Sequence, residues 1–300
     1  MVTETQTRTE RKGPMTPKTQ EVLDRLNDGI EKMVSSDDWK KGLKTLAQFR
    51  NYSWGNAILI ATQKPNASLV AGFQQWRKKF RRHVKKGEKA IRIVAPSQYK
   101  KKEKDPVTGE ERVVKSGLYF RIVCVFDVSQ TDGEELVLPP RPERLGDEPA
   151  DAADILAKLE AYAGTLGFRV DWISGAIDGA DGLNGDCNYT LRRIRVRSDF
   201  SSAQRIKTLC HEIAHAILHE PAGVISNSTT APSRNVMEVE AESTAYVVGT
   251  HLGLDTAAYT IPYVASWAKG QVDLVKKTGE RIAKTARQMI DAIDGEEVTQ

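Results

Sequence analysis

The segment Thr208–His219 places two histidines, His211 and His215, four positions apart within a largely apolar run. On an α-helix, positions i and i+4 lie one turn apart on the same face, so both imidazoles can reach a single metal ion. The apolar residues around them recur at helical spacing, and Ser201 or Ser202 can cap the first turn. These constraints predict a packed helix that carries a metal-binding pair on one side.

Glu212 stands beside the first of these histidines and completes an H-E-x-x-H motif. Zinc held by two neutral imidazoles and one further protein ligand keeps a fourth position for water, and lowers the pKa of that water to about 7. A neighbouring carboxylate can take the water's proton while the metal polarises a carbonyl. The motif therefore predicts Zn²⁺, one ion per chain, with Glu212 as general base. The alternative is a pair of helix histidines that bind no metal.

A third ligand is expected from a second helix over Met237–Val248. Glu238 and Glu242 are i, i+4 neighbours, so one carboxylate can bind the ion while the other accepts a hydrogen bond from a ligand imidazole. We assign Glu238 to the metal and Glu242 to the imidazole, with Glu240 turned to solvent, although each of the three stays open as the ligand. The alternative is an acidic first turn favoured by the helix dipole. His219 is expected to support the site or lie on the surface, or else to add a ligand.

Charge divides the chain into two unlike halves. Residues 1–130 hold 27 Lys+Arg against 14 Asp+Glu, whereas residues 131–300 hold 17 against 26. The first half is therefore expected to meet a polyanion, and the second half is not.

The basic residues of the first half gather between positions 77 and 89, close to several aromatic side chains. Lysine and arginine neutralise phosphates and aromatic rings stack on unpaired bases, so the combination favours single-stranded DNA. Duplex DNA stays open as a partner, although the sequence has no recognition-helix motif or zinc finger. The alternative is a solvated surface with buried aromatic rings. The candidate DNA-binding residues are Tyr52, Trp54, Asn56, Phe73, Trp76, Arg77, Lys78, Lys79, Arg81, Arg82, Lys85, Lys86 and Lys89.

Periodicity and composition predict an α+β fold with two domains. The expected divisions are a disordered tail at 1–16, a helix-plus-antiparallel-sheet DNA-binding domain at 17–131, a Pro-, Glu- and Gly-rich linker at 132–150, and a zinc metallopeptidase-like domain at 151–300.

Within the first domain we expect helices at 17–34, 39–49 and 53–61. Ser53 is expected to cap the third helix, and Ile58 and Leu59 are expected to point inward. Strands are expected at 90–95 and 118–127, separated by a charged hairpin tip over 100–115 that turns at Thr108-Gly109. The second domain is expected to hold a helix at 155–164, a strand at 168–172, a strand or hairpin at 189–197, a Ser/Thr/Asn loop at 221–234, and closing helices at 260–267 and 272–293. A peptide substrate is placed along 189–197, because an edge strand beside a zinc site commonly holds an extended peptide by strand addition. The Asp- and Gly-rich segment 175–185 is expected to be a flexible loop rather than a calcium site.

No apolar run approaches the roughly 18 residues of a membrane span, and the N-terminus lacks a signal-peptide core. We therefore expect a cytoplasmic protein with no membrane partner. The three cysteines, Cys124, Cys187 and Cys210, lack metal-site spacing and are expected to be reduced thiols.

These motifs together resemble a known family. Tyr52-x-x-x-Asn56, the Phe73–Trp76 segment and Val84–Lys89 resemble the single-stranded-DNA-binding domain of plasmid antirestriction proteins of the ArdC type. The H-E-x-x-H motif followed by Glu238-x-x-Ala241-Glu242 resembles their zincin-like metallopeptidase domain, which is similar to ImmA/IrrE and SprT-like proteases. This chain has Arg81 or Arg82 where the family tends to have glycine.

The resemblance implies protection of incoming single-stranded DNA during plasmid transfer. Three hypotheses follow: a zinc-dependent peptidase that cleaves an unidentified protein near DNA, an antirestriction protein that occludes nucleases and does not need its zinc site for catalysis, and a protease for DNA–protein crosslinks.

Overall fold

The structure is a computed structural model of the 300-residue chain. It describes residues 17–32, 36–104, 111–136, 149–179, 182–220, 233–255 and 271–295. Outside these residues lie the expected tail at 1–16, the turn at Thr108-Gly109, most of the linker, most of the loop 221–234 and the helix at 260–267. The described residues form helices and strands in both halves, which confirms the α+β class.

Three helices begin the described chain: α1 (Pro17–Glu31), α2 (Ser36–Gln48) and α3 (Trp54–Gln63). Ser53 caps α3 as predicted, because its hydroxyl accepts a hydrogen bond from the backbone N–H of Asn56 at 3.3 Å. The predicted inward residues Ile58 and Leu59 are fully buried. Asn56 itself fastens α3 to the neighbouring strand, since its amide exchanges hydrogen bonds of 2.8 and 2.9 Å with the backbone of Val94.

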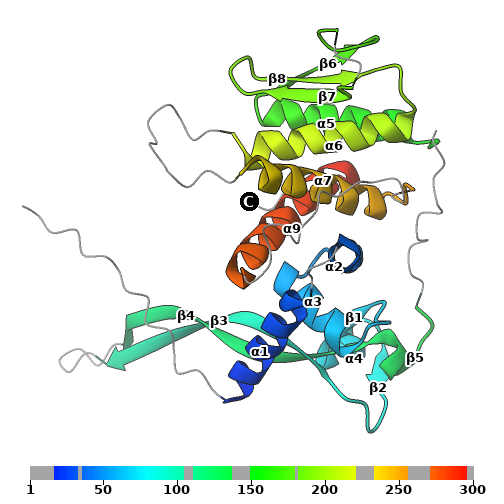
Figure 1. The fold of residues 1–300 in the computed structure, drawn as a ribbon. Helices are drawn as coiled ribbons and strands as arrows, with labels where there is room; N and C mark the ends of the chain where they lie inside the picture. Colours follow the sequence, from blue (N-terminus) through cyan, green and yellow to red (C-terminus); the bar gives the residue numbers. More distant parts are fainter. Residues whose placement is uncertain are drawn as a thin grey trace, which may run out of the picture.

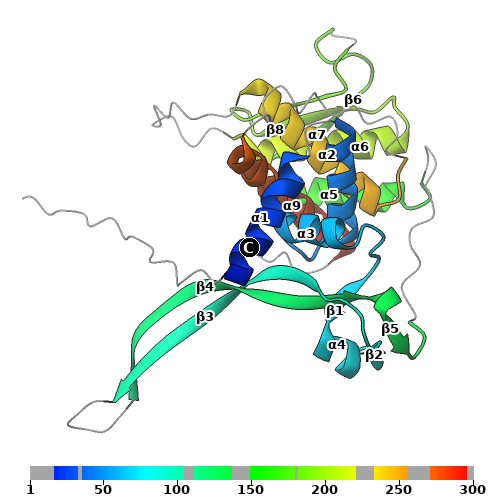
Figure 2. The same cartoon turned by 60° about the horizontal axis from the view of Figure 1, so that its bottom comes forward.

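The helices pack on an antiparallel sheet with the order β1-β4-β3, formed by β1 (Val70–Gly72), β3 (Ile91–Lys104) and β4 (Glu111–Asp127). The pairing of β3 with β4 continues to Lys104 opposite Glu111, so the ribbon extends far into the segment 100–115. The pairing confirms the predicted hairpin, but the tip was given too wide, since residues 100–104 and 111–115 belong to the two strands. The paired ribbon projects beyond α1 (Figure 2).

A short helix and a second pair of strands complete this region: α4 (Phe73–Lys78), β2 (Arg82–Val84), the 3₁₀ turn η1 (Val128–Gln130) and β5 (Thr131–Gly133). Arg81 has a φ of 52°, a left-handed conformation that glycine adopts without strain, which accounts for glycine at this place in the resembling family. Gly87, with a φ of 90°, lies in the turn between β2 and β3. Because β5 pairs with β2, residues 132 and 133 belong to this region and not to the linker.

The second half contains α5 (Ala152–Thr165), β6 (Arg169–Ile173), β7 (Gly185–Asn188), β8 (Arg193–Arg197), α6 (Ser202–Leu218), α7 (Arg234–His251) and α9 (Val272–Asp294). The sheet order is β6-β8-β7, with β8 parallel to β6 and antiparallel to β7. The prediction that 189–197 supplies an edge strand was wrong, since β8 is central and β7 lies at the edge. Alternation in a sequence reveals a strand, but it does not reveal the neighbours of that strand.

Helices α1 to α3 and the helices of the second half lie between the β1-β4-β3 sheet and the β6-β8-β7 sheet (Figure 1) and share one apolar core. Trp39 of α2 donates a hydrogen bond from Nε1 to Ser243 Oγ of α7 at 2.9 Å. Glu280 of α9 accepts hydrogen bonds from the backbone N–H groups of Gly55, at 3.0 Å, and Trp54, at 3.3 Å, at the start of α3. The first three helices therefore pack as closely on the second half as on their own sheet. Among the described helices, none is long and apolar enough to cross a membrane.

Candidate metal centre and nucleic-acid interface

Helices α6 and α7 bring the predicted metal ligands together. Ser201 caps α6 by accepting a hydrogen bond from Gln204 N, so the helix starts where the sequence indicated. His211 Nε2 and His215 Nε2 lie 3.1 Å apart, and Glu238 Oε2 of α7 lies 3.5 and 3.8 Å from them. One ligand atom from each residue falls within 4.8 Å of the other two.

This donor set fits a divalent ion such as zinc. Ligand atoms about 2.1 Å from a tetrahedral ion lie roughly 3.4 Å from one another, close to the separations seen between these three groups. Hydrogen bonds to His211 and His215 hold the pKa of Glu238 well below its usual value. Burial lowers the pKa of His215. Although burial opposes it, hydrogen bonds to Glu238 and Glu242 raise the pKa of His211 to about 10, so a bound metal would have to displace a proton from this imidazole. Neutral imidazole and an ionised carboxylate are the forms that bind a metal.

Glu212 is buried beside these ligands, on the side of α6 that meets β7. A Cβ atom added to Gly185 of β7 would lie 3.0 Å from Glu212 Oε1, so the strand and the carboxylate touch only because this residue is glycine. Burial raises the pKa of Glu212 to about 7. A carboxyl group with a pKa near neutrality can both accept and return a proton.

The first ligand imidazole is held from behind by a carboxylate. His211 Nδ1 lies 3.1 Å from Glu242 Oε2, and Lys207 Nζ lies 2.7 Å from the other oxygen of Glu242. The structure thus places Glu242 against the imidazole, as the i, i+4 argument from the sequence expected. With Nδ1–H donated to Glu242, the lone pair of His211 Nε2 faces the shared ligand position.

The second ligand imidazole has a longer support, in which His219 takes the supporting role that was one of its expected roles, whereas Glu240 and Arg281 were not expected there. His215 Nδ1 lies 2.9 Å from His219 Nδ1, His219 Nε2 lies 2.8 Å from Glu240 Oε2, and Arg281 Nε lies 3.1 Å from Glu240 Oε1. Glu240 is only 2% exposed. The expectation that Glu240 faces solvent was wrong, because α6 and α9 pack on two sides of α7 and bury the Glu240 side chain.

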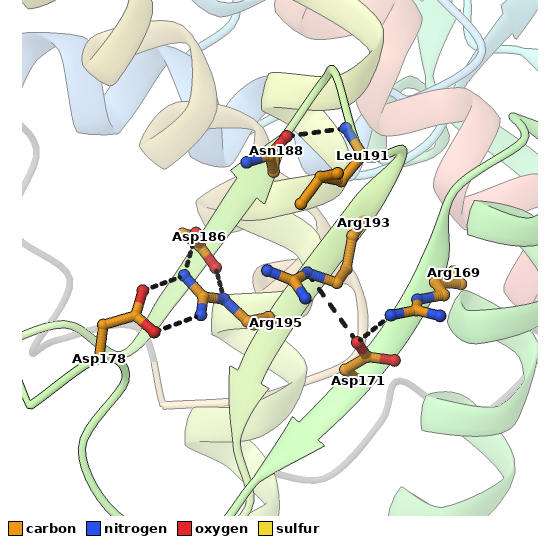
Figure 3. A network of polar contacts seen from close by, with 8 residues as sticks. All are labelled: Arg169, Asp171, Asp178, Asp186, Asn188, Leu191, Arg193 and Arg195. Carbon is orange, nitrogen blue, oxygen red and sulfur yellow. Dashed lines mark hydrogen bonds and ion pairs between the residues drawn. The ribbon is translucent and has the colours of Figure 1, made fainter.

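On the outer face of the small sheet, arginines hold the acidic residues (Figure 3). Arg195 of β8 forms hydrogen bonds of 2.7 to 2.8 Å with Asp178 and with Asp186. Asp178 belongs to the Asp- and Gly-rich segment that precedes β7, so this double contact fastens the described part of that segment to the sheet. The acidic groups therefore have an arginine partner, which fits the prediction that the segment is not a calcium site.

Two predicted DNA-binding aromatics do not reach the surface. Trp54 and Trp76 are both 0% exposed, and Trp76 Nε1 donates to the backbone oxygen of Phe126 at 2.8 Å. Stacking on a base would require them to leave the core, so these assignments were wrong. Tyr52 and Asn56 also have internal partners, since Tyr52 Oη donates to the backbone oxygen of Val70 at 3.1 Å.

Other aromatic side chains are exposed in this region. Phe73 of α4 is 49% exposed, and Phe120 of β4, which the sequence analysis missed, is 67% exposed, with Tyr119 at 38% beside it. Strand residues on a ribbon that projects from the body have solvent on both faces, a feature that local sequence does not show. Several predicted basic residues surround α4 and the turn before β3, and they are exposed: Arg77, Lys78, Lys79, Arg81, Lys85, Lys86 and Lys89.

Some of these cations have partners. Arg82 is half-buried and donates to the backbone oxygens of Thr131, Gly133 and Glu134, which fixes β2 to β5. Lys85 Nζ donates to Ser129 O at 2.9 Å. Arg82 is therefore better placed to hold the fold than to contact a phosphate.

Comparison with known proteins covers both halves of the chain. Residues 16–126 match the family described as the N-terminal domain of anti-restriction factor ArdC, and residues 174–265 match the family of IrrE N-terminal-like domains in the M78 peptidases. This chain is ArdC-like in its arrangement of domains. The ArdC-like chain is also 30% identical over 310 residues to an uncharacterised protein of Bacillus anthracis, and the match covers 92% of the chain and 51% of that protein. It thus spans about half the length of this curated relative.

Two solved structures share the fold of the ArdC-like chain. The metal-free crystal structure of the antirestriction protein ArdC from plasmid R388 has a TM-score of 0.56 and 23% identity, with 93% of this chain and 98% of that chain covered. The Mn(II)-bound structure of the same protein has a TM-score of 0.53 and 20% identity, with 92% and 96% covered. The likeness therefore spans both domains of the ArdC-like chain.

Proposed function

We propose that the ArdC-like chain is a metal-dependent peptidase that acts beside single-stranded DNA as an antirestriction protein. The observation that carries the peptidase assignment is the convergence of His211, His215 and Glu238 on one position with Glu212 beside them. The ArdC protein of plasmid R388 binds Mn(II) in one of its structures, which supports a divalent ion here. Zn²⁺, one per chain, is the ion we expect for two imidazoles and a carboxylate.

The described side chains divide the chemistry among them. When bound, the metal would polarise the scissile carbonyl and make a water molecule more acidic. Glu212 accepts the proton of the attacking water and returns it to the leaving amine. Strand β7 pairs with β8 on one side, and no described strand pairs with its other side. That open edge offers backbone groups to an extended peptide next to Glu212. This edge replaces the segment 189–197 as the place where we expect the substrate.

Replacing the proposed third ligand tests the metal assignment. Glu238→Gln removes a charged ligand, so we expect this variant to lose the single ion that the wild-type chain holds after dialysis, as measured by elemental analysis. Glu160→Gln, which alters an exposed carboxylate on α5, serves as the matched control and should keep its ion. Retention of the ion by Glu238→Gln together with its loss from Glu242→Gln would contradict the assignment and favour Glu242 as ligand.

The DNA-binding half of the proposal rests on exposed rings among cations. Phe73 follows directly from β1 and pairs edge-on with Phe126 of β4, and Arg77, Lys78 and Lys79 lie within a turn or two of it. Aromatic rings suit single strands, because a duplex hides the faces of its bases. The excess of 13 positive charges over residues 1–130, from 27 Lys+Arg and 14 Asp+Glu, supports a polyanionic partner.

Two sets of substitutions separate stacking from charge. We expect Phe73→Ala and Phe120→Ala each to weaken binding of single-stranded DNA by about 1 to 3 kcal/mol with an unchanged salt dependence. Replacing Arg77, Lys78 and Lys79 with glutamine should instead flatten the salt dependence, by about 0.7 in the logarithmic slope for each phosphate that the variant no longer neutralises. Leu191→Ala, at an apolar residue exposed on the second domain, is the control. Equal binding by all variants would support a merely solubilising surface.

A further inference from the structure

We propose that His219, Glu240 and Arg281 position His215 for metal binding through two hydrogen bonds in series, which end in an ion pair between Glu240 and Arg281. This inference rests on the proposed metal centre. The series of contacts runs from α6 through α7 to α9, and each link is between 2.8 and 3.1 Å long. No residue of it belongs to the H-E-x-x-H motif other than His215 itself.

The direction of each hydrogen bond follows from the first. His215 Nε2 faces the ligand position beside His211 Nε2, so it must offer a lone pair, and the ring proton of His215 is left on Nδ1. That proton is donated to His219 Nδ1, which then acts as acceptor. His219 carries its own proton on Nε2 and donates it to the carboxylate of Glu240. A single arrangement of protons therefore satisfies both rings and fixes the orientation of the ligand imidazole.

Because His219 and Glu240 are buried, the Glu240 carboxylate needs the positive charge of Arg281. The His219 side chain is fully buried and Glu240 is nearly so. An ionised carboxylate in such a place is costly without a paired cation. Arg281 supplies that cation, and its guanidinium also donates to the backbone oxygen of Leu218 at 2.6 Å, at the end of α6. One arginine thus fixes both the carboxylate and the helix end on which His219 lies.

His211 contacts its carboxylate directly, whereas His215 reaches one only through His219, because of where each histidine lies along α6. Glu242 reaches His211 directly, and Lys207 holds it, so that support has one carboxylate and one cation. His215 lies one turn further along α6, where the carboxylate on α7 is Glu240. The imidazole of His219, one more turn along, fills the space between them. The support of His215 therefore depends on α9, which the support of His211 does not use.

The test is the affinity of the intact protein for Zn²⁺ alone, measured by competition with a chromophoric chelator, together with the visible spectrum of the Co²⁺-substituted protein. We expect His219→Gln and Glu240→Gln to weaken Zn²⁺ binding about 10- to 100-fold and to alter the Co²⁺ spectrum. Asp291→Asn is the matched control, because it changes a buried carboxylate of α9 that pairs with Arg50 away from the metal centre. The control should lose stability without losing affinity for Zn²⁺.

Arg281→Gln keeps the test decisive if a fully buried variant fails to fold, because the Arg281 side chain is partly exposed. It should weaken Zn²⁺ binding, and Arg281→Lys should restore most of the affinity. Unchanged affinity in the folded His219, Glu240 and Arg281 variants would overturn the proposal, as would an equal loss in Asp291→Asn. A wild-type chain that binds no Zn²⁺ would instead overturn the metal centre itself.

Discussion

At the scale of single residues, Gly185 allows β7 to lie against Glu212, the proposed general base. Gly185 faces α6, where an added Cβ would lie 2.7 Å from Thr208 Cγ2 and 2.9 Å from the backbone oxygen of Arg195. Backbone cannot retreat cheaply from such a contact, so any larger residue would push β7 and Glu212 apart.

Gly185→Ala should therefore impair catalysis more than metal binding. We expect a loss of peptidase activity on the order of 100-fold from the displaced carboxylate, and a loss of about 1 to 3 kcal/mol in the free energy of unfolding. Peptide hydrolysis and urea denaturation measure the two effects. Gly182→Ala, in the loop before β7 and with nothing within 4 Å of its Cβ, should change neither, and a similar loss there would contradict the steric explanation.

Residue spacing predicted the part of the centre that lies on one face of each helix. His211 with His215, and Glu238 with Glu242, follow from the i, i+4 rule alone. The supporting role of His219 was one of the expectations left open, whereas the roles of Glu240 and Arg281 did not follow, because they depend on α9, which is distant in the sequence and covers the other side of α7. For the same reason the sequence could not separate Trp54, which α9 buries, from exposed rings such as Phe73.

At the scale of elements, α3 and α9 interlock through a glycine. An added Cβ on Gly279 would lie 2.3 to 2.5 Å from atoms of the Trp54 ring. Alanine in a helix interior is usually favoured over glycine by about 1 kcal/mol. Here the steric overlap with a fully buried indole should outweigh that preference.

Gly279→Ala is therefore expected to destabilise the protein by about 1 to 2 kcal/mol, the sum of these opposing effects. Gly164→Ala is the matched helical control, since nothing lies within 4 Å of its added Cβ, and it should be neutral or stabilising by up to about 1 kcal/mol. Thermal or urea unfolding of both variants decides the point. Stabilisation by Gly279→Ala would mean that the two helices are not packed as described.

The boundaries of most helices could be predicted from caps and periodicity, whereas the arrangement of strands could not. Ser53 and Ser201 are local signals, and both helices begin there. The order β6-β8-β7 depends on which strands pair, and 185–188 has too few apolar residues to reveal an edge strand. The long β3–β4 ribbon was underestimated because lysine and glutamate fill 100–104, so no apolar alternation marks the strand there.

At the scale of the whole molecule, one helix, α9, contacts both the first helices and the residues behind the candidate metal centre. Neighbouring residues of α9 hold the start of α3, through Glu280, and the residues behind His215, through Arg281. The basic first half and the acidic second half therefore meet in a common helical core. This common core includes residues of the candidate metal helices α6 and α7 and of α2 and α3, whereas the sheet that carries Phe120 packs on a second apolar cluster.

The most direct test of this account compares cleavage of an unfolded protein substrate by the wild-type chain and by Glu212→Gln at equal metal content, with and without single-stranded DNA. We expect the wild type to cleave, and to cleave faster with DNA, while Glu212→Gln keeps its ion and its DNA binding but cleaves nothing. Cleavage by Glu212→Gln at the wild-type rate would contradict the role of Glu212. A metal-loaded, DNA-bound wild type that cleaves no substrate would contradict the peptidase and favour protection of DNA by occlusion.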